Sequence, residues 1–315
     1  MPGPTLLVGG MGFIGLHTAR SFLDAGQDVV VTYNTHRREP DFLEAELGTR
    51  AKVEQLDVLD AARVDDIIQT HKPEGVVYLA VPALAGVSPA DEFKTNTAGY
   101  LNVLEASRAA GVRRLSVTSS LAVYASVKQR PWHEDMTFPV SSGNPTEAYK
   151  KGLEILGLYF GQRTGLEVVM LRVAGIFGPM YHSMANLPSR LCVAAAHGRA
   201  PDFTGMRYGP PKADDGNDAC YVKDVADGIR MVHLTDKLEH RVYNVGNGRV
   251  TRNRELVEAI REVVPEFSAE LPEGGEADNR YMDLSRTTAE TGYRPKIGVE
   301  RGLAEYVSWL RTHPN

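Results

Sequence analysis

The chain has 315 residues, 43% hydrophobic and 24% charged, and 35 basic against 40 acidic side chains give it a formal net charge of −5. This composition excludes a disordered chain, its apolar runs are far shorter than the ~18–20 residues that cross a bilayer, and its charge argues against nucleic-acid binding. Two cysteines and a first segment without a basic leader or an apolar signal region predict a cytoplasmic protein with no metal centre.

Strands and helices are predicted to alternate through the first half of the chain. The expected strands are nearly continuous apolar runs, typical of strands buried on both faces, at residues 5–8, 28–33, 51–56, 75–79, 115–119 and 167–172. The expected helices lie between them, at residues 12–25, 61–70, 91–110 and 145–163. This alternation predicts an α/β protein with a Rossmann-like, doubly wound parallel sheet.

The pattern loosens after about residue 178. Proline and glycine gather between residues 179 and 216, which is typical of a loop-rich lobe that covers a ligand. Helices are expected again at residues 222–234, 252–264 and 299–312, and a strand at 241–245. We therefore expect a smaller C-terminal lobe built on the main sheet.

Three glycines, Gly9, Gly12 and Gly15, follow the first predicted strand, and Phe13 and Ile14 stand between them. The first glycine permits a tight turn, the second lets the backbone approach a pyrophosphate, and the third lets the helix pack closely on the sheet. The amides at the helix N-terminus then face the phosphates. An ordinary strand–turn–helix is the alternative, but the context favours a dinucleotide-binding loop.

The end of the second predicted strand bears on the choice of dinucleotide. Asn34 stands there, with no acidic residue to bind a ribose 2′-hydroxyl, and Arg37 and Arg38 follow. Arginines can pair with a 2′-phosphate, so the sequence favours NADP over NAD. The alternative is that both arginines are solvated and that Glu39 or Asp41 takes the ribose.

Several motifs occur in an order that resembles a known family. They are the glycine loop, VYLA at residues 77–80, NTAG at 96–99, TSSLAVY at 118–124, GP at 178–179, YVKDVA at 221–226 and YNVG at 243–246. Nearly end to end, the chain resembles the extended short-chain dehydrogenase/reductase superfamily, in its NAD-dependent epimerase/dehydratase branch. The resemblance implies a dinucleotide-binding domain at residues 1–178, to which residues 222–250 return, and a substrate-binding lobe at 179–221 and 251–315.

Further contacts with the dinucleotide follow from these positions. Asp57, at the end of the third predicted strand and next to Val58, is expected to accept a hydrogen bond from the adenine amino group. Capping of the next helix is the alternative role for Asp57. By the resemblance, Leu79 and Ala80 end the strand beside the cofactor, and Asn96 lies in the helix that follows.

The family's chemistry uses a serine or threonine, a tyrosine and a lysine. Ser120 stands four residues before Tyr124, as the family serine does, although it could simply cap its own turn. Counting back from residues 164–166 puts the family lysine on Lys150 and the family tyrosine on Thr146. The sequence therefore departs from the family at its catalytic tyrosine.

Another register would make Tyr149 the catalytic tyrosine, but it puts Leu153 where lysine is required. The hydroxyl of Thr146 does not ionise near neutral pH, so it can hold a substrate oxygen but cannot act as the base. We expect Tyr149, Tyr124 or His182 to carry the proton instead, and Lys150 to bind the nicotinamide ribose.

Two further departures concern the substrate. Gly175 replaces an asparagine, and residues 217–220 lack an arginine, where the family's sugar-nucleotide epimerases contact substrate. His182, Arg190 and Arg207 in the lobe could bind another anion or hydroxyl pattern, although solvated surface charge is the alternative. The resemblance implies NAD(P)-dependent epimerisation, dehydration or oxidoreduction of a hydroxyl- or carbonyl-bearing small molecule. The alternatives are an atypical reductase or isomerase with another acid–base group, and a non-enzymatic dinucleotide sensor.

Residues 153–160 are apolar almost all round, and a helix of that kind must be buried on more than one face. As in family dimers, we expect a homodimer formed through the helices at 91–110 and 145–163. Loops of the lobe covering the second face are the alternative.

Overall fold

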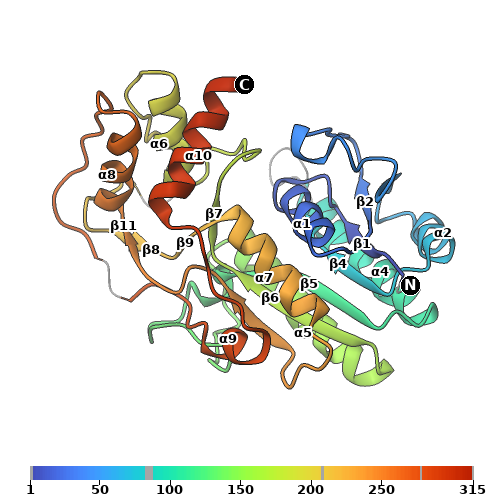
Figure 1. Cartoon of the computed structure of the whole chain (residues 1–315). Helices are drawn as coiled ribbons and strands as arrows, with labels where there is room; N and C mark the ends of the chain where they lie inside the picture. Colours follow the sequence, from blue (N-terminus) through green and yellow to red (C-terminus); the bar gives the residue numbers. More distant parts are fainter. Residues whose placement is uncertain (1–2, 82–87, 207–208, 277–278, 314–315) are drawn as a thin grey trace. The chain divides into compact units, whose positions relative to one another are not determined.

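The computed structural model describes residues 3–81, 88–206, 209–276 and 279–313, and its largest sheet among these residues has seven strands. The strand order is β10-β6-β5-β4-β1-β2-β3, and the β3-β2-β1-β4-β5 pairings are parallel (Figure 1). This order reverses between β1 and β4, as in doubly wound sheets, and confirms the predicted fold class. The strands are β1 Thr5–Val8, β2 Val29–Tyr33, β3 Ala51–Gln55, β4 Gly75–Tyr78, β5 Arg114–Ser120, β6 Glu167–Val173 and β10 Val242–Val245.

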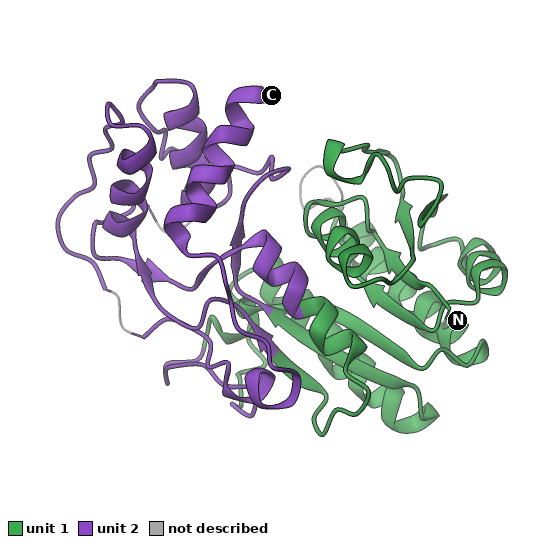
Figure 2. Ribbon diagram, viewed as in Figure 1, with its two compact units in different colours: residues 1–126, 137–172, 229–243 green, residues 127–136, 173–228, 244–315 purple. Residues whose placement is uncertain are grey.

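The chain divides into two compact units (Figure 2). Unit 1 holds Met1–Ser126, Thr137–Arg172 and Ile229–Tyr243, and unit 2 holds Val127–Met136, Val173–Gly228 and Asn244–Asn315. Most of the sheet and the whole glycine loop therefore belong to unit 1, which is the unit that positions the candidate site described below.

Some helices of unit 1 begin at a residue whose side chain caps them. The side chain of Asp60 accepts a hydrogen bond from the backbone amide of Arg63 at the start of α2, and that of Asn144 accepts one from the amide of Glu147 at the start of α5. The predicted helix at 91–110 is instead α3, a π-helical turn η2 and α4 in succession. The bounds are α1 Phe13–Asp24, α2 Ala61–His71, α3 Pro89–Lys94, η2 Thr95–Gly99, α4 Tyr100–Ala109 and α5 Pro145–Thr164.

Arg114 is a fully buried charge in the core of unit 1. Its guanidinium bonds Glu167 at 2.8 Å and donates to the carbonyl oxygens of Val232, His233 and Thr235. These carbonyls end α7 Val222–Leu234, where a helix has unsatisfied acceptors. One side chain thus satisfies the end of that helix and joins it to β5.

Unit 2 contains short strands and a group of helices. β7 Gly175–Phe177 pairs with β9 Ala219–Tyr221, and β8 Gly216–Asn217 pairs with β11 Thr251–Arg252. α8 Asn253–Val263 and α10 Val299–Thr312 pack against each other and against α6 Leu187–Ala196, and α9 Ser285–Thr291 lies between α8 and α10 in sequence.

Helix α6 corrects the expectation that residues 179–216 form loops. Asn186 caps it by accepting the amide of Ser189, and Pro188 occupies its first turn, where a proline costs no hydrogen bond. Its apolar residues are buried almost throughout. The many prolines and glycines around this segment concealed its helical periodicity.

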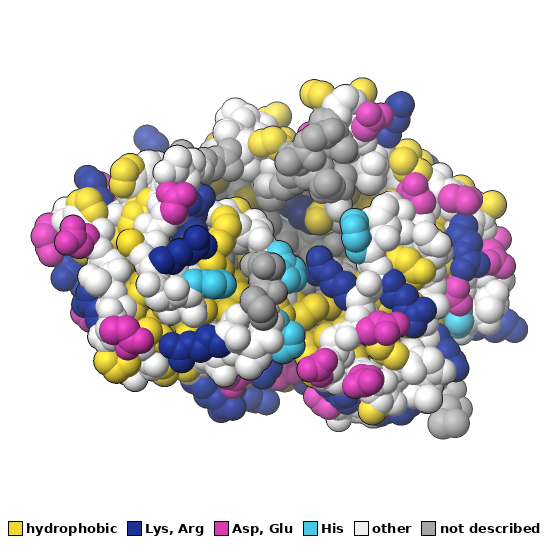
Figure 3. Space-filling view, turned by 90° about the horizontal axis from the view of Figure 1, so that it is seen from above, with side chains coloured by type: hydrophobic (Ala, Val, Ile, Leu, Met, Phe, Trp, Pro, Cys, Tyr) yellow, Lys and Arg dark blue, Asp and Glu magenta, His cyan; other side chains and the backbone are white. Residues whose placement is uncertain are grey.

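No helix in the described part of the chain is long and apolar enough to span a membrane. On the face drawn in Figure 3, basic, acidic and hydrophobic side chains are interspersed over the described surface. This distribution accords with the small net charge of −5.

Candidate functional site

The glycine loop joins β1 to α1, and a side chain at Gly9, Gly10 or Gly15 would have no room. Gly9 has φ +77°, and a Cβ there would lie 2.9 Å from the Cα of Ala80 at the end of β4. A Cβ on Gly15 would lie 2.5 Å from the Cα of Gly10. The backbone of the loop therefore packs directly on β4 and on the start of α1, which is the arrangement a dinucleotide loop requires.

The N-terminus of α1 fits a pyrophosphate. Its N-cap, Gly12, has no side chain with which to cap the helix, and the first turn holds no acidic residue. Phe13 and Ile14, both half-buried, begin the helix. The first amides of a helix and its dipole attract an anion, so this end of α1 could hold the phosphates of a dinucleotide.

The loop after β2 begins at Asn34 and carries two arginines before its first acidic residue, Glu39. Asn34 is exposed, and its carbonyl oxygen accepts a hydrogen bond from Gln55 at 3.0 Å. Arg37 is exposed and forms an ion pair of 2.7 Å with Glu39, whereas Arg38 is half-buried. An exposed pair of this kind contributes little stability, so the guanidinium of Arg37 could exchange Glu39 for a phosphate.

Asp57 is exposed and turns the chain after β3. Its carboxylate accepts the amide of Leu59 at 3.0 Å, while the cap of α2 is Asp60. The neighbouring Val58 is buried, and its carbonyl oxygen accepts from Asn102 at 2.9 Å. Asp57 thus follows the end of β3, at the same edge of the parallel sheet as the glycine loop that follows β1.

The remaining dinucleotide candidates lie at the end of β4 and in the π-helical turn. Leu79 donates its amide to the carbonyl oxygen of Val8 at 2.9 Å, and Ala80 follows it, half-buried. Asn96 is buried, and its side chain donates to the carbonyl oxygen of Glu92 at 2.9 Å. Single π-helical turns are frequent at functional sites.

Ser120 ends β5, and the side chain of Lys150 bonds the backbone of the same strand. The Ser120 hydroxyl is half-buried and accepts the amide of Ala122 at 3.1 Å, so it caps the turn η3 Leu121–Tyr124 and still has its own proton to donate. The Lys150 ammonium is buried and donates to the carbonyl oxygen of Thr118 at 2.6 Å. Burial lowers the pKa of Lys150 to about 8.

Thr146 and Tyr149 lie on the first turns of α5, ahead of Lys150. Both are half-buried, and residues three and four apart on a helix are neighbours. The hydroxyl of Tyr149 donates to a carboxylate oxygen of Glu92 on α3 at 3.1 Å. Burial and this carboxylate raise the pKa of Tyr149.

Tyr124 is fully buried in the core of unit 1. Its hydroxyl accepts from Arg172 at 2.7 Å, and the guanidinium carbon of Arg172 lies 4.9 Å from the centre of the ring. Arg172 also pairs with Glu154 at 2.7 Å, and Glu154 accepts from the hydroxyl of Ser119. Sequence reasoning missed this network, and its only signal was a glutamate four residues after Lys150 on an otherwise apolar helix segment.

A second buried pair fixes the loop before α5. Lys151 bonds Glu147 at 2.8 Å, and its ammonium also donates to the carbonyl oxygens of Pro139 and Ser141. Glu147 accepts in addition from the hydroxyl of Ser126 at 2.7 Å. The start of α5 is thus held to the preceding loop and to the end of η3.

The expected substrate residues lie in unit 2. The ring of His182 is exposed and meets Trp309 with ring centres 5.9 Å apart. The guanidinium of Arg190 donates to the carbonyl oxygens of Met184, Asp202 and Thr204, so it ties loops of the lobe together. Arg207 lies outside the described residues.

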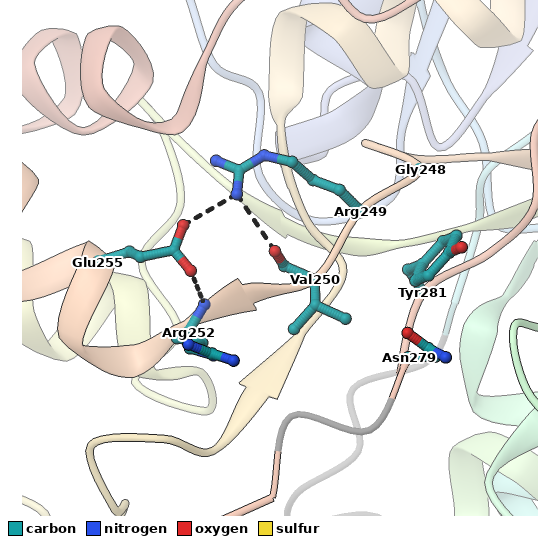
Figure 4. Close-up of a pocket in the computed structure, with 7 residues that line it drawn as sticks. All are labelled: Gly248, Arg249, Val250, Arg252, Glu255, Asn279 and Tyr281. Atoms are coloured by element: carbon teal, nitrogen blue, oxygen red, sulfur yellow. Dashed lines mark hydrogen bonds and ion pairs between the residues drawn. The ribbon is translucent and has the colours of Figure 1, made fainter.

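Unit 2 also holds a pocket of about 400 Å³ that sequence reasoning did not foresee (Figure 4). Arg249 reaches across it to Glu255 at 2.9 Å, and the second oxygen of Glu255 accepts the amide of Arg252. The lining residues are Gly248, Arg249, Val250, Arg252, Glu255, Asn279 and Tyr281.

One buried carboxylate organises the backbone beside this pocket. Asp218 accepts the amides of Asn247, Gly248 and Met282, so it joins two segments that are distant in sequence. Burial raises the pKa of Asp218 to about 6. Among the described residues, no three His, Cys, Asp or Glu side chains gather so as to hold a metal ion.

Comparison with known proteins identifies the family. The model of the NAD dependent epimerase/dehydratase family matches residues 5–246. The UDP-glucose 4-epimerase of Lactobacillus helveticus is 25% identical over 98% of this chain and 97% of its own. The dTDP-glucose 4,6-dehydratase of Streptomyces griseus is 30% identical over 98% of this chain and 94% of its own.

Solved structures agree with this match. The UDP-glucose 4-epimerase of Thermus thermophilus, in complex with NAD, is 26% identical with a TM-score of 0.78, over 98% of this chain and 99% of that one. The UDP-N-acetylglucosamine 4-epimerase of Methanobrevibacter ruminantium has the same fold, with a TM-score of 0.83 at 23% identity over 99% of both chains.

Proposed function

The chain belongs to the NAD dependent epimerase/dehydratase family, and we propose that it is an oxidoreductase or isomerase that acts on a hydroxyl or carbonyl group of a small molecule. The observation that carries this proposal is the buried Lys150 beside the end of β5, in a unit that also holds the closely packed glycine loop. A buried lysine without a carboxylate at bonding distance costs free energy, so a functional role explains its presence.

In this proposal, the chain's own residues bind and orient. The amides after Gly12 hold the pyrophosphate, Lys150 binds the nicotinamide ribose, and Ser120 donates a hydrogen bond to the reacting oxygen. A bound nicotinamide dinucleotide would supply the hydride acceptor and donor. Thr146 occupies the place of the family tyrosine and holds a substrate oxygen without ionising.

Another group must then move the proton. Tyr124 is fully buried and its hydroxyl is engaged by Arg172, which leaves it poorly suited to meet a substrate. His182 belongs to the other unit. Tyr149, half-buried and one turn from Thr146, is the candidate that the contacts favour.

We propose NADP as the preferred cofactor, although the Thermus thermophilus relative is described with NAD. The support is the neutral Asn34 at the end of β2 and the exposed Arg37 next to it in the same loop. NADP⁺ should bind at least tenfold more tightly than NAD⁺, and replacing Arg37 and Arg38 together with serine should remove the difference. Tenfold tighter binding of NAD⁺ by the wild type would contradict this preference.

The substrate would be bound by the lobe at residues 179–221 and 251–315, with residues 1–178 and 222–250 as the dinucleotide domain. Gly175 and Asn217 do not supply the side chains with which sugar-nucleotide epimerases contact substrate, so we propose a hydroxyl- or carbonyl-bearing compound of another kind. The ring of His182 is exposed, and we expect it to contact this compound, whereas Arg190 donates to three carbonyl oxygens of the lobe.

We also propose a homodimer through helices 91–110 and 145–163. Four large apolar side chains are more than half exposed on α4 and α5, namely Leu101 at 53%, Ile155 at 62%, Leu156 at 51% and Tyr159 at 56%. Large apolar side chains exposed on two helices that contact each other are typical of an interface. Light scattering should give a dimer at micromolar concentration, and Ile155→Glu should give a monomer; a monomeric wild type would contradict the proposal.

The enzyme itself is tested with a substrate screen. Purified protein with NADP⁺ or NAD⁺ is offered UDP-glucose, dTDP-glucose, free aldoses and simple secondary alcohols, and absorbance at 340 nm and product chromatography are followed. Turnover that is lost in Lys150→Met supports the proposal. Tight cofactor binding without turnover of any compound would instead support the non-enzymatic sensor.

A further inference from the structure

Two side chains outside the family's serine, tyrosine and lysine set meet beside Thr146. The hydroxyl of Tyr149 on α5 donates to the carboxylate of Glu92 on α3 at 3.1 Å, across 57 positions of sequence. Both residues are half-buried, so water can reach the pair without surrounding it. The bond therefore forms at the border between the core of unit 1 and the surface.

The pair lies close to where the family places its tyrosine. Tyr149 is three residues after Thr146 and directly before Lys150 on the same helix, and side chains three apart are neighbours on a helix surface. Glu92 belongs to the segment that continues into the π-helical turn with Asn96, whose side chain donates to the carbonyl oxygen of Glu92. Both partners are thus anchored to elements that hold the candidate site.

We propose that Tyr149 and Glu92 form a proton relay that takes over the acid–base role of the missing tyrosine. The inference rests on the proposed function. When the substrate hydroxyl is oxidised by NAD(P)⁺, its proton passes to the Tyr149 oxygen while the phenol proton passes to the Glu92 carboxylate. The hydride from the same carbon is taken up by the dinucleotide, so the carbonyl product, the reduced dinucleotide and a protonated Glu92 balance the step.

The electrostatics of Tyr149 explain why a relay is needed. Burial and the carboxylate of Glu92 raise the pKa of Tyr149, so the phenol keeps its proton at neutral pH. A protonated phenol can accept a substrate proton only if it gives up its own, and Glu92 is the acceptor at bonding distance.

The other charged groups near the pair are engaged elsewhere. On α3, Asp91 accepts from Ser88 and lies 3.7 Å from Lys94. On α5, Lys150 bonds the carbonyl oxygen of Thr118, and the Glu147–Lys151 pair faces the loop at residues 139–141. If activity falls on acidification, replacing Glu92 therefore tests whether its carboxylate is the group responsible.

The test compares Tyr149→Phe, Glu92→Gln and their double variant, using the compound of the screen that is turned over fastest. Each single change should lower kcat about 10²–10⁴-fold, and the double variant should be no slower than the slower single one, because a relay acts as a unit. Dissociation constants for the dinucleotide should change less than threefold. Glu105→Gln, which alters only a surface pair with Arg108 on α4, is the matched control and should keep wild-type kcat.

Two further measurements separate a relay from a structural tie. The acid limb of the pH–kcat profile should disappear in Glu92→Gln, and NMR of ¹³Cζ-labelled tyrosine should show the Tyr149 pKa falling toward 10 in that variant. If Glu92→Gln keeps wild-type kcat and its acid limb, the relay is wrong while the proposed function stands. If the wild type turns over no compound of the screen, the proposed function fails and the relay fails with it.

Discussion

Lys150 should make the stability of the protein rise with pH above neutrality, and replacing it with methionine should abolish that rise. The ammonium is buried and donates a hydrogen bond to the carbonyl oxygen of Thr118 at 2.6 Å. Methionine has a similar length and carries no charge, so Lys150→Met removes the titration with little change in packing volume.

The size of the effect follows from the pKa. Burial lowers the pKa of Lys150 from 10.5 to about 8, so between these values the unfolded chain binds a proton that the folded chain does not. The free energy of unfolding then increases with pH, because stability rises wherever the unfolded state holds more protons. Integrated from pH 7 to pH 10, the wild type should gain about 2.5 kcal/mol relative to the variant.

The assay is urea unfolding of wild type and Lys150→Met at pH 7 and pH 10, with the difference between the two proteins as the measured quantity. Lys52→Met is the control, because Lys52 lies exposed at the edge strand β3 and should leave the pH dependence as in the wild type. Equal pH dependence of wild type and Lys150→Met, within 0.5 kcal/mol or so, would refute the reasoning. The same variant should bind the dinucleotide about 10–100-fold more weakly, since a hydrogen bond from a charged donor is worth about 1.5–3 kcal/mol.

Three further predictions follow from unit 1. Arg172→Met leaves the Glu154 carboxylate buried without its partner and should cost about 3–5 kcal/mol in urea unfolding; a loss below 1 kcal/mol would contradict the buried pair. Gly15→Ala should lower the unfolding free energy by about 1–3 kcal/mol and abolish dinucleotide binding, because the new Cβ would lie 2.5 Å from backbone atoms of Gly10. Gly152→Ala is the control: its Cβ would have nothing within 4 Å, so it should stabilise α5 by about 0.5–1 kcal/mol. Burial lowers the pKa of His233 to about 3, so its side chain stays neutral in the folded chain while the unfolded chain takes up a proton on acidification. Relative to His233→Asn, the wild type should therefore lose about 2 kcal/mol of unfolding free energy between pH 7 and pH 5. An unchanged difference between the two proteins would contradict the lowered pKa.

The fold could be predicted because its signal is local and repeated. Each buried strand is a short apolar run, α2 and α5 begin at the capping residues Asp60 and Asn144, and the glycine spacing falls at the first strand–helix junction. Helix α6 and the π-helical turn escaped prediction for different reasons. Prolines and glycines surround the first, and the second has the composition of an ordinary helix and differs only in its hydrogen bonds.

The side-chain partners of the candidate site could not be predicted, since they depend on contacts between distant segments. The spacing of Thr146, Tyr149 and Lys150 was readable from the sequence, but Glu92 stands 57 residues before Tyr149. Tyr124 and Tyr149 were both candidates in the sequence, and the structure distinguishes them by the full burial of Tyr124 and by the guanidinium of Arg172 at its hydroxyl.

The contacts of α5 also bear on which residue stands at the position of the family's catalytic tyrosine: Thr146, or Tyr149 if the helix is shifted by three residues. Lys150 is held by the end of β5, and Glu154, one turn further, is held by Arg172 of β6, so two buried polar contacts define the rotation of the helix against the sheet. A shift by three residues, which would bring Tyr149 to the position of the family tyrosine, would put Leu153 against the carbonyl oxygen of Thr118 and break the pair with Arg172. Breaking a buried ion pair costs about 3–5 kcal/mol, a large part of the stability of a domain. The two contacts thus define the rotation of α5, which places Tyr149 one turn after Thr146, with a carboxylate at its hydroxyl.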